Sequence, residues 1–283
     1  MRLVARDLVV DGIRLHVVEG GTGPAVMLLH GLSATHANWE HALPALAERF
    51  RVIAPDLPGH GRSAKPDAPY TVDFYAGVMR SLGRALGVSE AIVIGNSLGG
   101  QIAIELGITC PTWTRALVLV APAAGFGTVA RTLGWTLDVL ARPRLLRLAL
   151  PRALELCFHD GSLPAWTLRR RLLAERLEHD DFPEFARAVR RSIVGALAVD
   201  EEAWARLAQP TLVLWGREDR FLPLARSAVL LRAVPHARLV VLEGCGHLPM
   251  VERPEAFNRV TREFLDALAE EPLERASGGA SCS

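Results

Sequence analysis

The chain has 283 residues, of which 50% are hydrophobic and 22% charged, and its formal net charge at pH 7 is +1. A chain of this length can bury the core of one α/β domain with or without an insertion, and its near-zero net charge argues against a nucleic-acid-binding protein. We expect neither a signal peptide nor a transmembrane segment, because no apolar run is long enough for either.

The spacing of the cysteines predicts the cellular compartment. All four lie far apart, without a Cys-x-x-Cys pair, at Cys110, Cys157, Cys245 and Cys282. This spacing is typical of reduced thiols rather than of a disulfide framework or a zinc site. We therefore expect a cytoplasmic protein without a metal or other cofactor. The sequence makes no prediction of the oligomeric state.

Strands and helices alternate through the first 120 residues. Residues 1–20 contain two segments rich in β-type side chains that meet at Asp11-Gly12, a pair typical of a hairpin turn. Thr71 is a suitable N-cap for a helix that runs to Leu86. The spacing of apolar residues further predicts strands over Ala25–Leu29, Arg51–Ala54 and Arg115–Val120, and a helix over Trp39–Glu48.

A serine stands between a predicted buried strand and a predicted helix. The apolar run Ala91-Ile92-Val93-Ile94 leads into Gly95-Asn96-Ser97-Leu98-Gly99-Gly100, and the helical pattern follows from Gln101. A Gly-x-Ser-x-Gly sequence on such a turn holds the serine hydroxyl above the sheet, and its glycines avoid collisions with the neighbouring strand and helix. Backbone N–H groups at the start of a helix can also stabilise an oxyanion. Ser97 is therefore predicted to be an activated nucleophile.

The composition changes after residue 123. Residues 124–208 contain no convincing strand and are rich in Leu, Arg and Ala, so we expect an inserted, mainly helical lid between core segments 1–123 and 209–270. The tail 271–283, rich in Gly and Ser, is expected to be disordered. In the second core segment the pattern predicts strands over Thr211–Trp215 and Leu239–Leu242 and helices over Leu224–Ala233 and Pro254–Leu268.

This alternation predicts a mostly parallel sheet with helices on both faces. Ligands of such sheets bind beyond the carboxyl ends of the strands, so the partners of Ser97 should stand in loops that follow strands. Of the nine histidines only His30 and His247 clearly do so. His247, in a short glycine-rich loop after the last strand, is the expected general base. His30 is expected to be structural and to bond the backbone of its own loop.

The acid that orients the base should follow another strand. The loop Gly216–Pro223 supplies Asp219 as first candidate and Glu218 as second. The loop at 121–127, after the preceding core strand, has no carboxylate. The resulting order of nucleophile, acid and histidine is that of the α/β hydrolases.

Over nearly its full length the chain resembles the α/β-hydrolase superfamily. The resemblance implies an α/β-hydrolase fold, in which a mostly parallel eight-stranded sheet is flanked by helices and carries an inserted helical lid. It also implies an oxyanion hole formed by the backbone N–H groups of Leu32 and Leu98. The matching segments are Leu29-His30-Gly31-Leu32, Asp56–Ser63, Gly95–Gly100, Trp215–Pro223 and Gly246-His247.

Two of these segments also resemble carbon–carbon bond hydrolases of aromatic meta-cleavage pathways, namely Gly95–Gly100 and Trp215–Pro223. In that comparison Arg176 resembles the lid arginine that binds the substrate's carboxylate; the alternative is a solvated helix arginine. Asn96 is either a substrate-binding residue or a turn residue with a local backbone bond. Two features differ: Leu248 stands where those enzymes usually have tryptophan, and the oxyanion loop is poorer in glycine and proline.

We therefore predict a serine hydrolase that cleaves a carboxylic ester of an apolar or aromatic small molecule through an acyl-enzyme on Ser97. Trp166 and Leu248 are further candidate substrate-binding residues, because such pockets are largely apolar. One alternative is a carbon–carbon bond hydrolase of a 2-hydroxy-6-oxo-dienoate. Others are a non-catalytic ligand-binding protein of the same fold and a protein that acts at lipid surfaces through the cationic and apolar stretch Arg142–Leu148.

Overall fold

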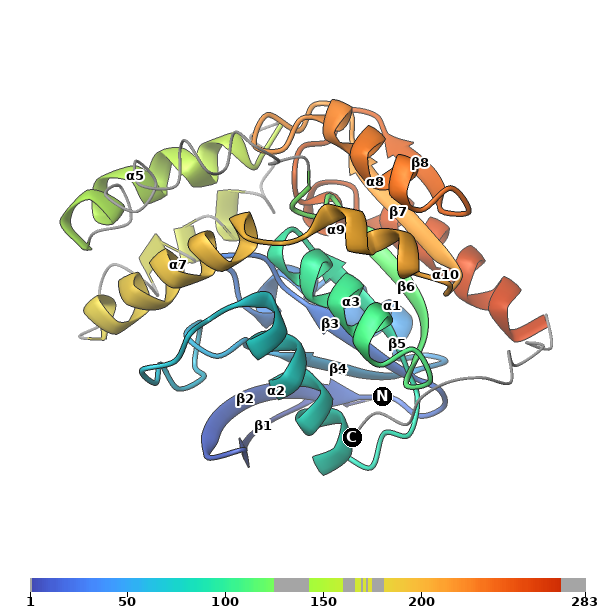
Figure 1. The fold of residues 1–283 in the computed structure, drawn as a ribbon, viewed down its shortest axis with the longest axis horizontal. Coiled ribbons are helices and arrows are strands. Elements are labelled where there is room, and N and C mark those ends of the chain that lie inside the picture. The colour runs from blue at the N-terminus through green and yellow to red at the C-terminus, as the bar shows by residue number, and fades with distance from the viewer. Residues whose placement is uncertain are drawn as a thin grey trace.

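The computed structural model describes residues 2–124, 143–159, 166–168, 170–171, 173–174 and 181–270. Its sheet has eight strands: β1 (Val4–Val10), β2 (Ile13–Gly20), β3 (Ala25–Leu29), β4 (Arg51–Pro55), β5 (Ala91–Asn96), β6 (Thr114–Val120), β7 (Thr211–Gly216) and β8 (Arg238–Leu242). They lie in the order β1-β2-β4-β3-β5-β6-β7-β8 (Figure 1). The β1–β2 and β2–β4 pairs are antiparallel and all other pairs are parallel. The predicted mostly parallel sheet is confirmed.

The hairpin at the start of the chain is the expected one. Asp11 and Gly12 have φ values of 49° and 76°, which are the left-handed conformations that a two-residue type I′ turn requires. Val10 pairs with Ile13 across this turn.

The helical elements are η1 (His36–Trp39), α1 (Ala42–Leu46), α2 (Val72–Ala85), α3 (Leu98–Thr109), α5 (Pro143–Leu156), α7 (Phe182–Leu197), η2 (Glu201–Arg206), η3 (Leu224–Arg226), α8 (Ser227–Ala233), α9 (Pro249–Glu252) and α10 (Pro254–Glu270). Thr71 caps α2 as predicted, because its hydroxyl accepts a hydrogen bond from the N–H of Phe74. The helix predicted over Trp39–Glu48 is shorter than expected: α1 covers only Ala42–Leu46, and Trp39 ends η1. Pro44 stands in the first turn of α1, where the missing N–H of a proline costs no helical hydrogen bond.

Side chains of the strands alternate between two hydrophobic clusters on opposite faces of the sheet. Met27 belongs to the cluster that contains Tyr75 of α2 and Ile102 of α3. Leu28 belongs to the other cluster, with Leu46 of α1 and Phe257 of α10. Because both faces are covered, the loops at the strand ends are left to bind ligands.

Between β6 and β7 the described residues include α5, α7 and η2, and residues 166–168, 170–171 and 173–174 are also helical. Helices α5 and α7 contact each other and lie to one side of the sheet and its flanking helices (Figure 1). Both fall within the segment expected to form the lid. Residues 125–142 and the tail expected to be disordered lie outside the described residues. In the part of the chain that the structure describes, no helix is long and apolar enough to span a membrane.

The cysteines depart from expectation at one position. Cys157 and Cys245 are buried, and neither forms a disulfide. Burial raises the pKa of the Cys245 thiol well above its ordinary value, and the nearby Glu252 carboxylate raises it further. Cys110 is disulfide-bonded, so the expectation of four reduced cysteines is wrong there.

A buried carboxylate organises the loop after β4. Oδ1 of Asp56 accepts hydrogen bonds from the backbone N–H of His36 at 2.7 Å and from its Nδ1 at 2.8 Å, and Oδ2 accepts from the N–H of Arg62 at 2.8 Å. Burial raises the pKa of Asp56, but the hydrogen bond and positive charge of His36 outweigh it and hold the pKa well below its ordinary value.

This lowered pKa makes Asp56 a source of acid-sensitive stability. Its unfolded pKa is about 3.9, so ionised Asp56 stabilises the fold above about pH 4 and loses that effect as the pH falls toward the folded pKa. Asp56→Asn is expected to lower the free energy of unfolding at pH 7 by about 1–3 kcal/mol, because one amide N–H would face a backbone donor. Urea denaturation at pH 7, 5 and 3 should show the gap to wild type narrowing with acid. A gap of equal size at all three pH values would contradict the assignment. The exposed Asp11, with Asp11→Asn, is the matched control, because asparagine also adopts the left-handed conformation of this turn position.

Candidate functional site

Ser97 occupies a strained turn between β5 and α3. Its φ is 54° and its ψ −115°, a region that costs a non-glycine residue on the order of 1–3 kcal/mol. The glycines around it permit the close packing: a Cβ on Gly95 would lie 2.1 Å from the carbonyl oxygen of Gly99, and one on Gly99 would lie 2.2 Å from that of Leu29. The turn therefore has the conformation predicted from the Gly-x-Ser-x-Gly sequence.

The structure brings Asp219 and His247 together. Nδ1 of His247 donates to Oδ2 of Asp219 at 2.7 Å, while Oδ1 of Asp219 accepts from the N–H groups of Phe221 at 2.9 Å and Leu222 at 2.7 Å. Both side chains are buried. The carboxylate thus selects the tautomer in which Nε2 is unprotonated. This Nε2 is buried and has no hydrogen-bond partner among the described residues.

The second candidate acid has another role. Oε2 of Glu218 accepts a hydrogen bond from the backbone N–H of Cys245 at 2.8 Å. This bond is the largest influence on the pKa of Glu218 and lowers it. Burial raises the pKa but is the weaker effect, so the pKa lies below its ordinary value. Glu218 therefore supports the loop that carries His247, and Asp219 is the carboxylate that contacts the imidazole.

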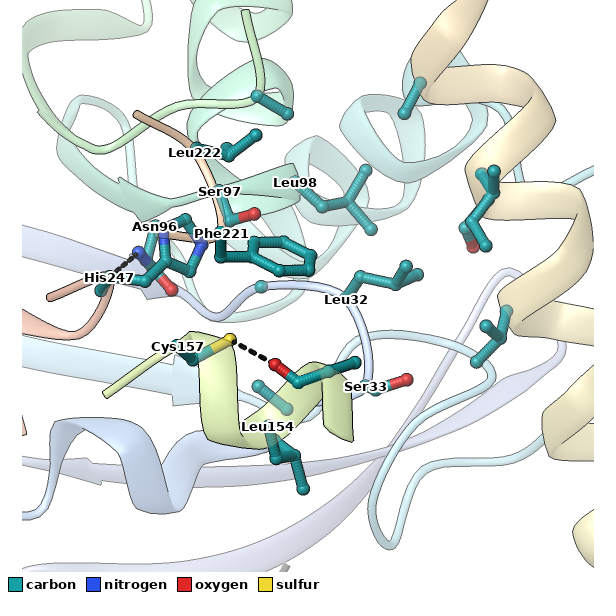
Figure 2. A pocket seen from close by; sticks show the side chains of 18 of the residues that line it. Leu32, Ser33, Asn96, Ser97, Leu98, Leu154, Cys157, Phe221, Leu222 and His247 are labelled. Carbon is teal, nitrogen blue, oxygen red and sulfur yellow. Dashed lines mark hydrogen bonds between the residues drawn. The ribbon is translucent and has the colours of Figure 1, made fainter. Parts of the chain in front are cut away.

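Ser97 and His247 line one cavity of about 420 Å³. Figure 2 shows Ser97 and Leu98 on one side of it, and on the other Leu154 of α5 and Cys157, the residue that follows α5. Most of the lining is aliphatic. Among the described lining residues, the polar side chains besides Ser97 and His247 are those of Ser33, Asn38, Asn96, Ser192 and Arg226.

The two predicted oxyanion donors flank Ser97. Leu32 and Leu98 both line the cavity (Figure 2), and neither backbone N–H donates a hydrogen bond to another described residue. A Cβ on Gly31 would lie 3.1 Å from both Oδ1 of Asn96 and Cβ of Ser97. Glycine at that position therefore lets the loop after β3 approach the serine closely.

The side-chain amide of Asn96 bonds the backbone of two segments distant in the sequence. Its Nδ2 donates to the carbonyl oxygens of Val120 at 3.1 Å and His247 at 3.2 Å. The amide therefore ties the end of β6 to the loop of His247, while part of the side chain lines the cavity. The expected local bond within the turn is therefore replaced by long-range bonds, and the substrate-binding role of Asn96 stays a prediction.

The other candidate binding residues differ in whether they line the cavity. Leu248 is buried and lines the cavity. Trp166 is 49% exposed and contacts the guanidinium of Arg170 rather than the cavity. Arg176 lies outside the described residues. His30 is structural as expected, because its Nε2 accepts from the N–H of Leu57 at 2.9 Å and its Nδ1 donates to the carbonyl of Gly31 at 2.8 Å.

Two residues at the site were missed by sequence reasoning. Asn38 on η1 is buried and lines the cavity, and its Oδ1 has no hydrogen-bond partner among the described residues. The ring of Phe221 lies 5.0 Å from the ring of His247, centroid to centroid. Asn38 stands in a segment that also holds Thr35, His36 and Glu40, so no local pattern distinguished it from its neighbours.

The end of α5 is hydrogen-bonded to the loop of His247. The backbone N–H of His247 donates to the carbonyl of Cys157 at 2.8 Å. Buried Glu252 spans the same junction, since Oε1 accepts from the N–H of Gly246 at 3.0 Å and Oε2 from that of His159 at 2.7 Å. The candidate site and α5 are thus joined at one end of the cavity.

Comparisons with known proteins find relatives along most of the chain. A family model described as "Alpha/beta hydrolase family" matches residues 26–260. The chain is 31% identical to 2-hydroxymuconate semialdehyde hydrolase of Pseudomonas sp. (strain CF600), over 93% of this chain and 94% of that protein. A solved membrane phospholipase A is similar with a TM-score of 0.78 and 29% identity, over 95% of this chain and 87% of that one. A variant of a meta-cleavage product hydrolase is similar with a TM-score of 0.78 and 28% identity, over 93% and 98%.

Proposed function

Since the chain belongs to the alpha/beta hydrolase family, whose fold the sequence predicted, we propose that it is a serine hydrolase that cleaves carboxylic esters with an apolar acyl group. The observation that carries this proposal is the 2.7 Å bond from Nδ1 of His247 to Asp219, beside a cavity that the imidazole shares with Ser97. A base held in this tautomer by a buried carboxylate can take the proton of a serine hydroxyl.

The proposed mechanism has two halves. Oγ of Ser97 attacks the ester carbonyl carbon while its proton passes to Nε2 of His247, and the N–H groups of Leu32 and Leu98 stabilise the oxyanion. The C–O bond to the alcohol then breaks, and His247 returns the proton to the leaving alkoxide. In the second half water attacks the acyl-enzyme, His247 accepts its proton, and the carboxylic acid leaves with the hydroxyl of Ser97 restored.

The lining favours an uncharged substrate. Among the described lining residues Arg226 is the only cation, and its Nη1 donates to the carbonyl of Ala124 at 3.0 Å. A cavity lined mostly by leucine and alanine stabilises an alkyl group and offers little to a carboxylate.

A carbon–carbon bond hydrolase is the second candidate, and specific observations favour it. Relatives named for that activity align over nearly the whole chain. Asn38 also presents an unpartnered Oδ1 at the cavity, and a buried acceptor of this kind suits a hydroxyl group on a ligand.

A substrate panel separates the two functions. We expect p-nitrophenyl butyrate to be cleaved with a kcat/KM about tenfold above that for the acetate, because each buried methylene contributes about 0.8 kcal/mol. The panel should include a thioester, a lactone and one 2-hydroxy-6-oxo-dienoate, each followed by initial rates. A dienoate kcat/KM about a hundredfold above that of every ester would reverse the proposal. Rates that fall steadily from acetate with chain length would refute the apolar acyl preference.

A further inference from the structure

The wall of the cavity that faces Ser97 is formed by α5 and α7, and this wall is apolar. Helix α5 contributes two rows of side chains, and within each row successive side chains are about one helical turn apart. One row is Leu146, Leu150 and Leu154, and the other is Ala149 and Ala153. Helix α7 contributes Val189, Ile193, Ala196 and Leu197. Among the described residues of this wall, Ser192 of α7 carries the one hydroxyl. That hydroxyl already makes two hydrogen bonds, with the hydroxyl of Tyr75 at 2.7 Å and to the carbonyl of Ala188 at 2.8 Å.

The contacts of α5 show which end of this wall lies nearest to Ser97. Its carboxyl-terminal end is at the site, where the carbonyl of Cys157 accepts from the N–H of His247, and Figure 2 shows Cys157 and Leu154 across from Leu32. With a rise of 1.5 Å per residue, Leu146 lies roughly 12 Å farther along the helix axis than Leu154. The apolar wall therefore leads away from Ser97 along α5.

The alanines leave room along this wall. Ala153 lies nearer to the site, and Ala149 lies roughly 6 Å farther along the axis. The leucine row of α5 and the residues of α7 line the same cavity as these two small side chains. A flexible unbranched chain can follow such a path, whereas a rigid branched or polar group would meet only aliphatic side chains without a hydrogen-bond partner.

We propose that the acyl group of the substrate is a linear, medium-chain fatty acyl group that runs from Ser97 along α5, first past Ala153 and then past Ala149. This proposal rests on the proposed ester hydrolysis. In the wild-type enzyme each methylene that enters this path raises kcat/KM about fourfold, the factor that corresponds to the burial of one methylene. The rise ends at the chain length that reaches the end of the path.

The test uses the two alanines as markers of chain length. Ala153→Phe and Ala149→Phe are assayed with p-nitrophenyl acetate, butyrate, hexanoate, octanoate and decanoate. The matched control is Leu148→Phe, on the outer side of the same helix, where the side chain is 74% exposed. Ala153→Phe is expected to lower kcat/KM for decanoate at least tenfold more than for acetate. The shortest chain that Ala149→Phe affects should be a few carbons longer than the shortest chain that Ala153→Phe affects. Leu148→Phe should follow the wild-type profile.

The outcomes distinguish the proposed acyl path from the proposed ester hydrolysis on which it rests. If wild type cleaves esters but both alanine variants keep its chain-length profile, the acyl path along α5 is refuted and ester hydrolysis stands. If wild type cleaves no ester and does cleave the dienoate, the proposed function itself fails. Labelling of Ser97 by a fluorophosphonate shows that a variant is folded. Ala153→Leu and Ala149→Leu, with smaller side chains, give the same comparison where a phenylalanine variant does not fold.

Discussion

Replacement of Ser97 by alanine is expected to lower the kcat/KM for p-nitrophenyl butyrate by about 10⁴-fold or more, because loss of the nucleophile removes the acyl-enzyme route. The remaining activity would come from the oxyanion donors and from binding alone. Initial rates with the ester, and labelling by a fluorophosphonate probe, measure the effect. The variant should take up no probe.

The control for this substitution is Ser81→Ala. Ser81 is another buried serine, but it lies on α2, where its hydroxyl accepts a hydrogen bond from Arg84 at 3.1 Å. It should retain activity within about twofold. A Ser97→Ala enzyme that hydrolyses the ester at the wild-type rate would refute the proposed mechanism. A wild-type enzyme that takes up the probe and turns over no substrate in the panel would instead support the non-catalytic alternative.

The second large effect is expected for Asp219→Asn, at about 10⁴-fold in kcat. The N–H groups of Phe221 and Leu222 both point at Oδ1 of Asp219, so the asparagine must keep its oxygen on that side. Its NH₂ group then faces Nδ1 of His247, which has to become an acceptor. The proton of the imidazole moves to Nε2, and the base can no longer accept the proton of the serine.

Glu218→Gln is the matched control for the acid. The glutamine keeps an oxygen that can accept from the N–H of Cys245, the bond that Glu218 makes. We expect a loss of less than tenfold, because the imidazole keeps its carboxylate partner. A larger loss in Glu218→Gln than in Asp219→Asn, measured as kcat at pH 8, would mean that Asp219 is not the acid.

The sheet and the positions of Ser97, Asp219 and His247 followed from local patterns. Apolar runs of strand length, each followed by a turn and a helix, predict a parallel sheet, and that topology places the ends of β5, β7 and β8 at one edge. The hairpin at Asp11 and the cap at Thr71 depend on single residues, so they were also predictable. Helix α9 was not, because it has only four residues and no apolar periodicity can show over that length.

The parts that the sequence left open depend on contacts between distant residues. Glu252 bonds His159 across 93 positions, and no local pattern carries that information. Trp166 was predicted to bind substrate on its residue type, but half of its surface is exposed. Which face of a helix lines a cavity depends on how the helix packs, so the leucine and alanine rows of α5 became visible only in three dimensions.

The hydrogen bond from the N–H of His247 to the carbonyl of Cys157 joins the residue that follows α5 to the loop that carries the imidazole. If α5 moves away, this buried donor loses its acceptor at a cost of about 1–3 kcal/mol. A ligand that packs against α5 therefore also favours the state in which the imidazole is held in place, and this coupling is reciprocal. Long acyl chains would then gain in turnover as well as in binding, whereas acetate, which does not reach α5, would leave the histidine loop at its resting population.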